Sequence, residues 1–271
     1  MKEVAFGQYY PANSFVHKMD PRAKILIVIA YIVGVFLVQP FHFLGFAACL
    51  LFVIIATLFS SVPFAKVIKS VRGILFFIIF SALLQIFFNK QGEVLWTWSF
   101  ITITDNGLLN AAFIVARITL IIIGASLLTY TTTPVELADG IESLLTPLKY
   151  IKFPVHEFAL IMSIALRFIP TLMDETDKII KAQKARGADF ESGNIFKRAK
   201  ALIPVLIPLL VSSFRRADEL ADAMDARCYS GSKNRTRYKK LTVSYRDFIG
   251  ILFVAALIAG AVLLNGVLGV L

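Results

Sequence analysis

The sequence lacks the motifs that usually hold disulfides, metals or nucleotides. Its two cysteines, Cys49 in an apolar run and Cys228 in a polar region, give neither a disulfide framework nor metal-ligand spacing. The three histidines, His17, His42 and His156, are too far apart to form a ligand set by spacing. The G-x-x-x-x-G-K-S/T sequence of P-loop nucleotide sites is also missing. We therefore expect this chain itself to bind no metal, nucleotide or other cofactor.

Apolar residues are abundant instead. They make up 58% of the 271 residues, 24 of which are phenylalanine, whereas soluble domains contain about 45–50%. The mean hydropathy of +0.75 indicates an integral membrane protein. A net charge of +10 would suit a nucleic-acid partner, but the basic residues fall between apolar runs, as in cytoplasmic loops of membrane proteins. We therefore expect a lipid bilayer, and no nucleic acid, as the surroundings of this chain.

Five apolar runs come near the ~17–25 residues that a helix needs to span a bilayer. The runs are 24–39, 41–61, 72–88, 107–129 and 247–269. The more polar region between the fourth and fifth runs contains amphipathic patterns. The sequence therefore predicts an all-α polytopic protein with about five transmembrane helices and a cytoplasmic block of amphipathic helices. Its predicted parts are 1–130 with four spans, 131–245 with the cytoplasmic helices, and 246–271 with the last span.

Basic residues orient these spans. They precede the first span, separate the second from the third, and are dense between 149 and 246. The loop at 39–41 and the C-terminus after Asp247 have none, and 89–106 has only Lys90. The positive-inside rule then predicts a cytoplasmic N-terminus and an outside C-terminus.

One span contains a charge, Arg117, near the middle of the fourth apolar run. An ionisable side chain at this depth is costly and usually faces protein or water. A packing or snorkelling role and a role in conformational change or in a substrate path both remain open.

The cytoplasmic block contains three predicted helices. The capping box Thr133-Pro134-Val135-Glu136 starts the first, an interfacial amphipathic helix. A 3.6-residue pattern after Pro154 continues through Pro170 and predicts one long helix ending at Gly187. The third is expected over about 197–229.

The two long helices end in the same short sequence, which we call the A-R cassette. The first copy is Ala182-Gln183-Lys184-Ala185-Arg186-Gly187 and the second is Ala223-Met224-Asp225-Ala226-Arg227-Cys228. An arginine at a helix C-terminus complements the helix dipole, and the alanines leave little bulk around it. Each cassette could therefore be a helix cap, with Gly187 at C′, or a cation that enters a neighbour's pocket.

Small residues recur every four positions in the second half of the third helix. Such spacing permits a close helix crossing. The small residues and their apolar neighbours are Ser213, Ala217, Leu220, Ala221 and Met224.

Acidic pairs on the long helices allow an enzymatic alternative. Asp174 with Asp177, and Asp218 with Asp222, could hold Mg²⁺ for a diphosphate, as in membrane prenyltransferases. Lysines and arginines within reach on the same helices favour surface ion pairs instead.

Several stretches together carry a family resemblance over essentially the whole chain. They are both A-R cassettes, Ile164 to Leu172, Arg215 to Ala221, Gly7-Gln8-Tyr9 and Asp20-Pro21-Arg22. They resemble the transmembrane T component of energy-coupling factor transporters. Cys228 departs from this pattern, since the family usually has glycine there.

This resemblance implies a function. The chain would be a non-catalytic subunit, in a prokaryotic plasma membrane, of an ABC-type importer that takes up a vitamin or similar micronutrient. It would link two ATPase subunits, which bind ATP and Mg, to a small membrane S component that binds the vitamin. The cytoplasmic helices would be coupling helices, and their small-residue face would contact the S component. The ATPase-docking residues would be Ala185, Arg186, Gly187, Ala226, Arg227 and Cys228.

Overall fold

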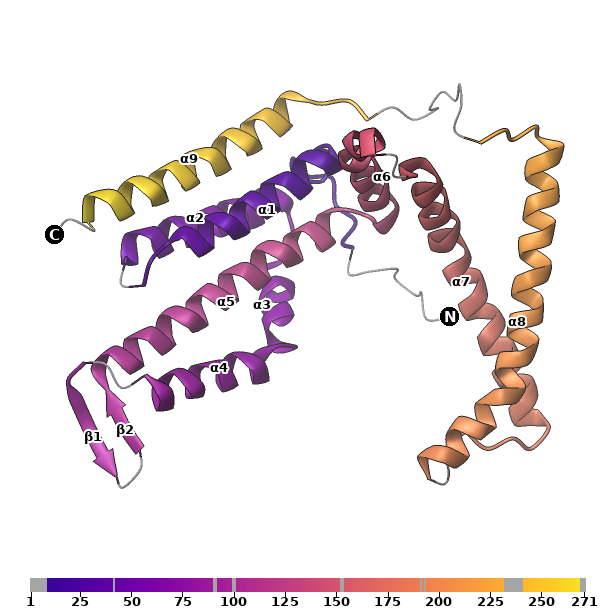
Figure 1. Ribbon diagram of the computed structural model, residues 1–271, viewed down its shortest axis with the longest axis horizontal. Helices are drawn as coiled ribbons and strands as arrows, with labels where there is room; N and C mark the ends of the chain where they lie inside the picture. Colours follow the sequence, from indigo (N-terminus) through magenta and orange to yellow (C-terminus); the bar gives the residue numbers. More distant parts are fainter. Residues whose placement is uncertain are drawn as a thin grey trace. The chain divides into compact units, whose positions relative to one another are not determined.

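The computed structural model forms two compact units (Figure 1). It describes residues 9–40, 42–89, 92–98, 101–151, 154–190, 192, 194–231 and 241–268. Within these ranges, only the backbone is described at residues 95–98, 101, 102, 195 and 264–268. The membrane unit comprises described residues 9–144 and 241–268, and the two-helix unit comprises 145–231.

The membrane unit consists of seven helices and one hairpin among its described residues. They are α1 (Pro21–Leu37), α2 (Phe43–Ser60), α3 (Phe64–Arg72), α4 (Leu75–Phe88), β1 (Val94–Trp98), β2 (Ile101–Thr104), α5 (Asp105–Thr131), α6 (Pro134–Leu145) and α9 (Tyr245–Leu268). The last residue of α6 lies at the boundary with the other unit.

The core of the membrane unit lies among α1, α2, α5 and α9. The buried Tyr31 ring stacks on Phe52 at 5.0 Å, and Phe52 stacks on Phe253 at 5.3 Å, so three helices meet at three rings. The Tyr31 hydroxyl donates to the Leu120 carbonyl of α5 at 3.3 Å. A Cβ at Gly124 would lie 2.4 Å from the Tyr31 ring. Glycine at that position therefore lets α5 approach α1 closely.

The helices agree with the predicted polytopic all-α class. Within the described residues, four helices are long and apolar enough to cross a membrane: α2, α5, α9 and, in the two-helix unit, α7 (Val155–Ala185). The predicted third span is shorter than expected, because α4 has 14 residues and meets α3 at a bend of 60°. Together α3 and α4 pass the same test as a fifth, broken span. The predicted first span is α1, with 17 residues.

The hairpin of β1 and β2 was not predicted; we expected 89–106 to be a loop. Its strands pair antiparallel, with Val94 opposite Thr104 and Trp98 opposite Ile101. Thr104 joins the hairpin to α5, since its hydroxyl accepts the Gly107 N–H at 3.2 Å and donates to the Asn89 carbonyl at 3.0 Å. The hairpin therefore leads directly into the N-cap of the longest helix of this unit.

The predicted capping box of α6 is confirmed. The Thr133 hydroxyl accepts the Glu136 N–H at 3.3 Å, and the Glu136 carboxylate accepts the Thr133 N–H at 3.1 Å. A Cβ at Gly140 would lie 3.1 Å from atoms of both Pro21 and Ile25, so α6 packs on α1. This contact places α6 in the same compact unit as α1.

The two-helix unit consists, in its described part, of a short 3₁₀ helix, η1 (Thr146–Ile151), followed by α7 (Val155–Ala185) and α8 (Ile195–Ala226). As predicted, α7 continues through Pro170. Helix α8 contains Pro204 and Pro208 and begins and ends slightly earlier than expected. The two helices run in opposite directions and cross (Figure 1).

Candidate functional site

The crossing of α7 and α8 is held by one carboxylate. Glu175 of α7 accepts hydrogen bonds from the Ser212 hydroxyl and from the Arg216 guanidinium of α8. All three side chains are half-buried. A charge-assisted bond in such surroundings is stronger than an exposed ion pair. This contact fixes how the two long helices present their ends.

The first A-R cassette ends α7 in a Schellman motif. The Ala188 N–H donates to the Gln183 carbonyl at 2.9 Å, and the Gly187 N–H donates to the Lys184 carbonyl at 3.0 Å. Gly187 has a φ of +87°, so the predicted glycine at C′ is confirmed. Arg186 is the last residue before this turn and is exposed.

The second A-R cassette ends α8 in the same way, although it lacks glycine. The Tyr229 N–H donates to the Met224 carbonyl at 3.0 Å, and the Cys228 N–H donates to the Asp225 carbonyl at 2.9 Å. Cys228 has a φ of +57°, a conformation that costs a residue with a Cβ roughly 1–2 kcal/mol. The substitution of cysteine for the usual glycine therefore leaves the cap geometry intact.

These two caps allow a reciprocal test. Gly187→Ala should destabilise the last turn of α7, and Cys228→Gly should stabilise that of α8, each by about 1 kcal/mol. A Cβ added at Gly187 meets nothing within 4 Å, so the expected loss of stability comes from the backbone conformation and not from a steric clash. Hydrogen exchange of the amides in both last turns measures the effect. Unchanged protection in both variants would contradict this account of the caps.

The two cassette arginines are equivalent in their surroundings. Both are exposed, and within the described residues neither guanidinium forms a hydrogen bond or ion pair. The helices cross near Glu175 and Ser212. At 1.5 Å per residue, Arg186 lies about 16 Å along α7 from Glu175, and Arg227 lies about 22 Å along α8 from Ser212. The two helices run in opposite directions (Figure 1), so their C-terminal ends, which carry the two cations, lie on opposite sides of the crossing.

The small-residue face of α8 is only partly buried. Ala217 and Ala221 are exposed, while Ser213, Leu220 and Met224 are half-buried. The side-chain hydrogen bonds from α8 to Glu175 of α7 come from Ser212 and Arg216, which are next to this face in the sequence. The two alanines therefore remain available to another protein, and the close crossing predicted for them stays a prediction.

The acidic pairs of the enzymatic alternative are spread over the helix surfaces. Asp174, Asp177, Asp218 and Asp222 are all exposed. The described part of the chain contains no group of three or more His, Cys, Asp or Glu side chains that could hold a metal ion. The arrangement of these carboxylates gives no support to a diphosphate site.

Arg117 of α5 binds the end of α1. Its guanidinium donates to the Val38 carbonyl, at the C-cap of α1, and lies 5.6 Å from the Phe46 ring centroid. Its Nε is buried, with no hydrogen-bond partner among the described residues. A cation at a helix C-terminus satisfies an otherwise unpaired carbonyl. This geometry supports the packing role among the two that the sequence left open.

A buried polar network at the start of α1 was missed by the sequence reasoning. Asp247 is fully buried; its carboxylate accepts the Asp20 N–H at 2.8 Å and the Ser244 N–H at 2.7 Å. Lys24 is 4% exposed and donates to oxygens of the segment before α1 and of the end of α5. The spacing Ser244-x-x-Asp247, typical of a helix N-terminus, was the available signal.

His17 belongs to the same region. Its ring nitrogens lie 2.7 Å from the Ser14 hydroxyl and 2.8 Å from the Tyr10 carbonyl oxygen. Burial lowers the pKa of His17, although the Tyr10 carbonyl opposes that shift. A neutral ring fits both neighbours, because Nε2–H donates to the carbonyl while Nδ1 accepts from the hydroxyl. The histidine thus fastens the segment before α1 and is not placed as a metal ligand.

Comparison with known proteins gives consistent matches. The profile of the family described as "CbiQ: Cobalt transport protein" matches residues 12–238. A protein from Ruminiclostridium cellulolyticum, named "Energy-coupling factor transporter transmembrane protein EcfT", is 52% identical over 249 residues, covering 92% of each chain. A protein of the same name from Clostridium kluyveri is 51% identical, over 97% of each chain. Another from Bacillus subtilis is 44% identical, over 95% of this chain and 98% of the relative.

The chain belongs to the CbiQ/EcfT family. It is a transmembrane component of an energy-coupling factor transporter, as the resemblance predicted. The relatives are named as transporter components, which favours a non-catalytic membrane subunit over the prenyltransferase-like alternative.

Proposed function

We propose that this EcfT-family chain is the coupling subunit of an ABC-type importer. It links ATP hydrolysis in two ATPase subunits to uptake of a vitamin or similar micronutrient held by a small membrane S component. In this proposal the chain binds no cofactor itself, and ATP and Mg are bound by the ATPases.

The paired A-R cassettes carry this proposal. Two helix ends with the same Schellman geometry each present one exposed arginine without a partner in the described chain. An arginine in this position offers a rigid fork of donors to acceptors in a partner's groove. Two equivalent cations on opposite sides of one crossing suit a pair of similar partners. The docking sites are then Ala185, Arg186 and Gly187 for one ATPase, and Ala226, Arg227 and Cys228 for the other.

The small-residue face of α8 supports the second half of the proposal. Exposed Ala217 and Ala221 permit close approach of a helix, and Phe214 nearby is 68% exposed. Close packing of small residues is a main source of helix association in membranes. We assign this face, with Ser213, Leu220 and Met224, to contact with the S component.

The proposal requires both long helices at the cytoplasmic surface of a prokaryotic plasma membrane, with the N-terminus inside and the C-terminus outside. Labelling needs a position outside the docking cassettes, and a Cys228→Ser background leaves only the buried Cys49. In that background a membrane-impermeant maleimide should label Arg198→Cys, at an exposed position of α8, only after the cells are permeabilised. Glu93→Cys, at the exposed start of the hairpin, should be labelled in intact cells. Labelling of Arg198→Cys from outside would overturn the topology.

Purification of the tagged chain from its native membranes tests the assembly. We expect it to carry two ABC-type ATPase subunits and one small hydrophobic protein, with ATP hydrolysis in the complex. A lone, homogeneous chain with Mg²⁺-dependent turnover of a diphosphate would favour the enzyme instead.

A further inference from the structure

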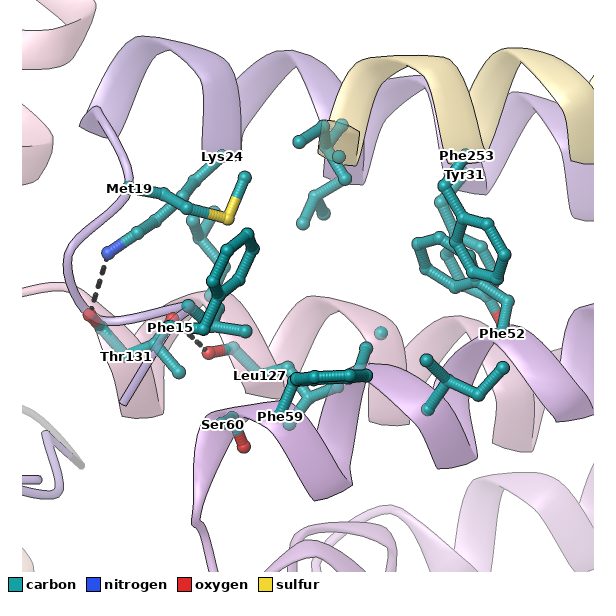
Figure 2. Close-up of a pocket in the computed structure, with 18 of the residues that line it drawn as sticks. Phe15, Met19, Lys24, Tyr31, Phe52, Phe59, Ser60, Leu127, Thr131 and Phe253 are labelled. Carbon is teal, nitrogen blue, oxygen red and sulfur yellow. Dashed lines mark hydrogen bonds between the residues drawn. The ribbon is translucent and has the colours of Figure 1, made fainter. Parts of the chain in front are cut away.

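The membrane unit contains an apolar cavity of about 420 Å³ between α1, α2, α5 and α9. Figure 2 shows Lys24 and Thr131 at one end, and the rings of Tyr31, Phe52 and Phe253 at the other. Tyr31 and Phe52 are buried and Phe253 stacks on Phe52, so the three rings close that end of the cavity.

The polar groups along this cavity already have partners. Lys24 donates three hydrogen bonds to protein oxygens, at 2.9 to 3.2 Å. The hydroxyls of Ser60 and Thr131 donate to carbonyls of their own helices, at 2.9 and 2.7 Å. A buried water needs two to four polar partners, and apolar cavities without them stay dry. The lining therefore favours an apolar occupant.

The shape of the cavity limits what that occupant is. The lining follows α1 from Lys24 to Tyr31 and α2 from Phe52 to Ser60, about 10–12 Å at the helical rise of 1.5 Å per residue. Half of a bilayer's hydrocarbon core is ~15 Å deep, so an acyl chain of one leaflet has the matching length. An α-helix, about 10 Å wide with its side chains, is too thick for this volume.

The cavity also reaches the surface of the spans. Two of its wall residues, Phe59 of α2 and Ile249 of α9, are 58% and 51% exposed. Phe15 packs on Phe59 with ring centroids 6.1 Å apart. Lipid chains that surround the spans can therefore enter beside these side chains.

A cation lies where the cavity meets the surface. The Arg246 guanidinium is 5.6 Å from the Phe15 ring centroid and 5.4 Å from that of Tyr245, and its Nε donates to the Tyr245 hydroxyl at 3.3 Å. The nearby carboxylate of Asp247 is buried and occupied by backbone N–H groups. Basic groups between helices at a membrane interface attract anionic lipid headgroups.

We propose that this cavity holds one acyl chain of an anionic phospholipid whose phosphate binds Arg246. The lipid fills the space between four helices and joins the segment before α1 to the start of α9. All residues of this site belong to the membrane unit, whereas the A-R cassettes belong to the two-helix unit.

Photolabelling of the full chain in vesicles tests the wild-type site. The vesicles contain phosphatidylethanolamine and phosphatidylglycerol that carries a photoreactive acyl chain, and labelled peptides are mapped by mass spectrometry. We expect Met19, Phe59 and Ile249 to be labelled several-fold more than Leu44, an exposed residue of α2 outside the cavity. Equal labelling of cavity and outer faces would overturn the proposal.

Matched variants test the two parts of the site. Ala56→Phe fills the cavity and should remove most of the labelling, whereas Ala48→Phe, on the exposed face of α2, should not. Arg246→Gln should remove the preference for phosphatidylglycerol over phosphatidylcholine with the same acyl chain, and Arg72→Gln, an exposed control, should keep it. Equal labelling of the wild type by both lipids would overturn the anionic assignment, and unchanged labelling of Ala56→Phe would overturn the cavity as its site.

Discussion

Arg186→Ala and Arg227→Ala should each weaken ATPase docking by roughly 2–5 kcal/mol, or about 30-fold or more in the dissociation constant. Truncation removes several charge-assisted hydrogen bonds and leaves acceptors of the partner buried without donors. Both arginines are exposed in this chain, so the change should not affect its own fold. Titration of the purified membrane complex with the ATPase subunits measures the effect.

Three controls distinguish docking from a general loss of charge. Arg198→Ala removes an exposed arginine of α8 that belongs to neither cassette and should have little effect. Lysine at position 186 or 227 should restore docking only in part, because an ammonium lacks the planar fork of donors. Asp218→Asn and Asp222→Asn should be milder than either arginine change. If the aspartate variants lose activity while the arginine variants keep both docking and uptake, the enzymatic alternative is favoured.

Asp247→Ala should destabilise the membrane unit by about 2–5 kcal/mol, because it leaves two buried N–H donors without an acceptor. Those donors are the amides of Asp20 and Ser244, which start α1 and α9 respectively. The carboxylate therefore fastens the C-terminal helix to the N-terminal one. Thermal unfolding of the purified protein, compared with wild type, measures the loss.

Two further variants make this test specific. Asp247→Asn keeps one acceptor oxygen and should lose roughly half as much stability. Asp225→Ala removes an exposed carboxylate near the end of α8 and should leave the unfolding temperature nearly unchanged. Equal stability of all three variants and wild type would show that the buried network does not hold α1 and α9 together.

The sequence predicts local structure well where one segment contains its own signals. The capping box of Thr133 and Glu136 needs only four consecutive residues, and both of its hydrogen bonds are present. The A-R cassettes end their helices as expected, because a C-cap depends on the last turn and the two residues after it. The apolar periodicity of α7 likewise predicted that the helix continues through Pro170, as it does.

Features that join distant segments could not be predicted in the same way. The bond between the Asp20 amide and Asp247 spans almost the whole chain, and nothing near either residue indicates the other. The packing of Gly140 on Pro21 likewise joins α6 to α1, a helix far away in the sequence. The bend of 60° between α3 and α4 depends on their surroundings, and it shortened the predicted third span. The hairpin at 94–104 was missed because short strands lack a strong pattern.

ATP-driven uptake into vesicles measures whether Arg186 and Arg227 couple ATP hydrolysis to transport. The chain, its two ATPases and the S component are reconstituted, and accumulation of the labelled vitamin is measured alongside its binding to the S component. We expect the double variant Arg186→Ala, Arg227→Ala to retain vitamin binding but to lose ATP-dependent uptake, while Arg198→Ala keeps both. Uptake by the double variant at the wild-type rate would contradict the claim that these two helix ends couple ATP hydrolysis to transport.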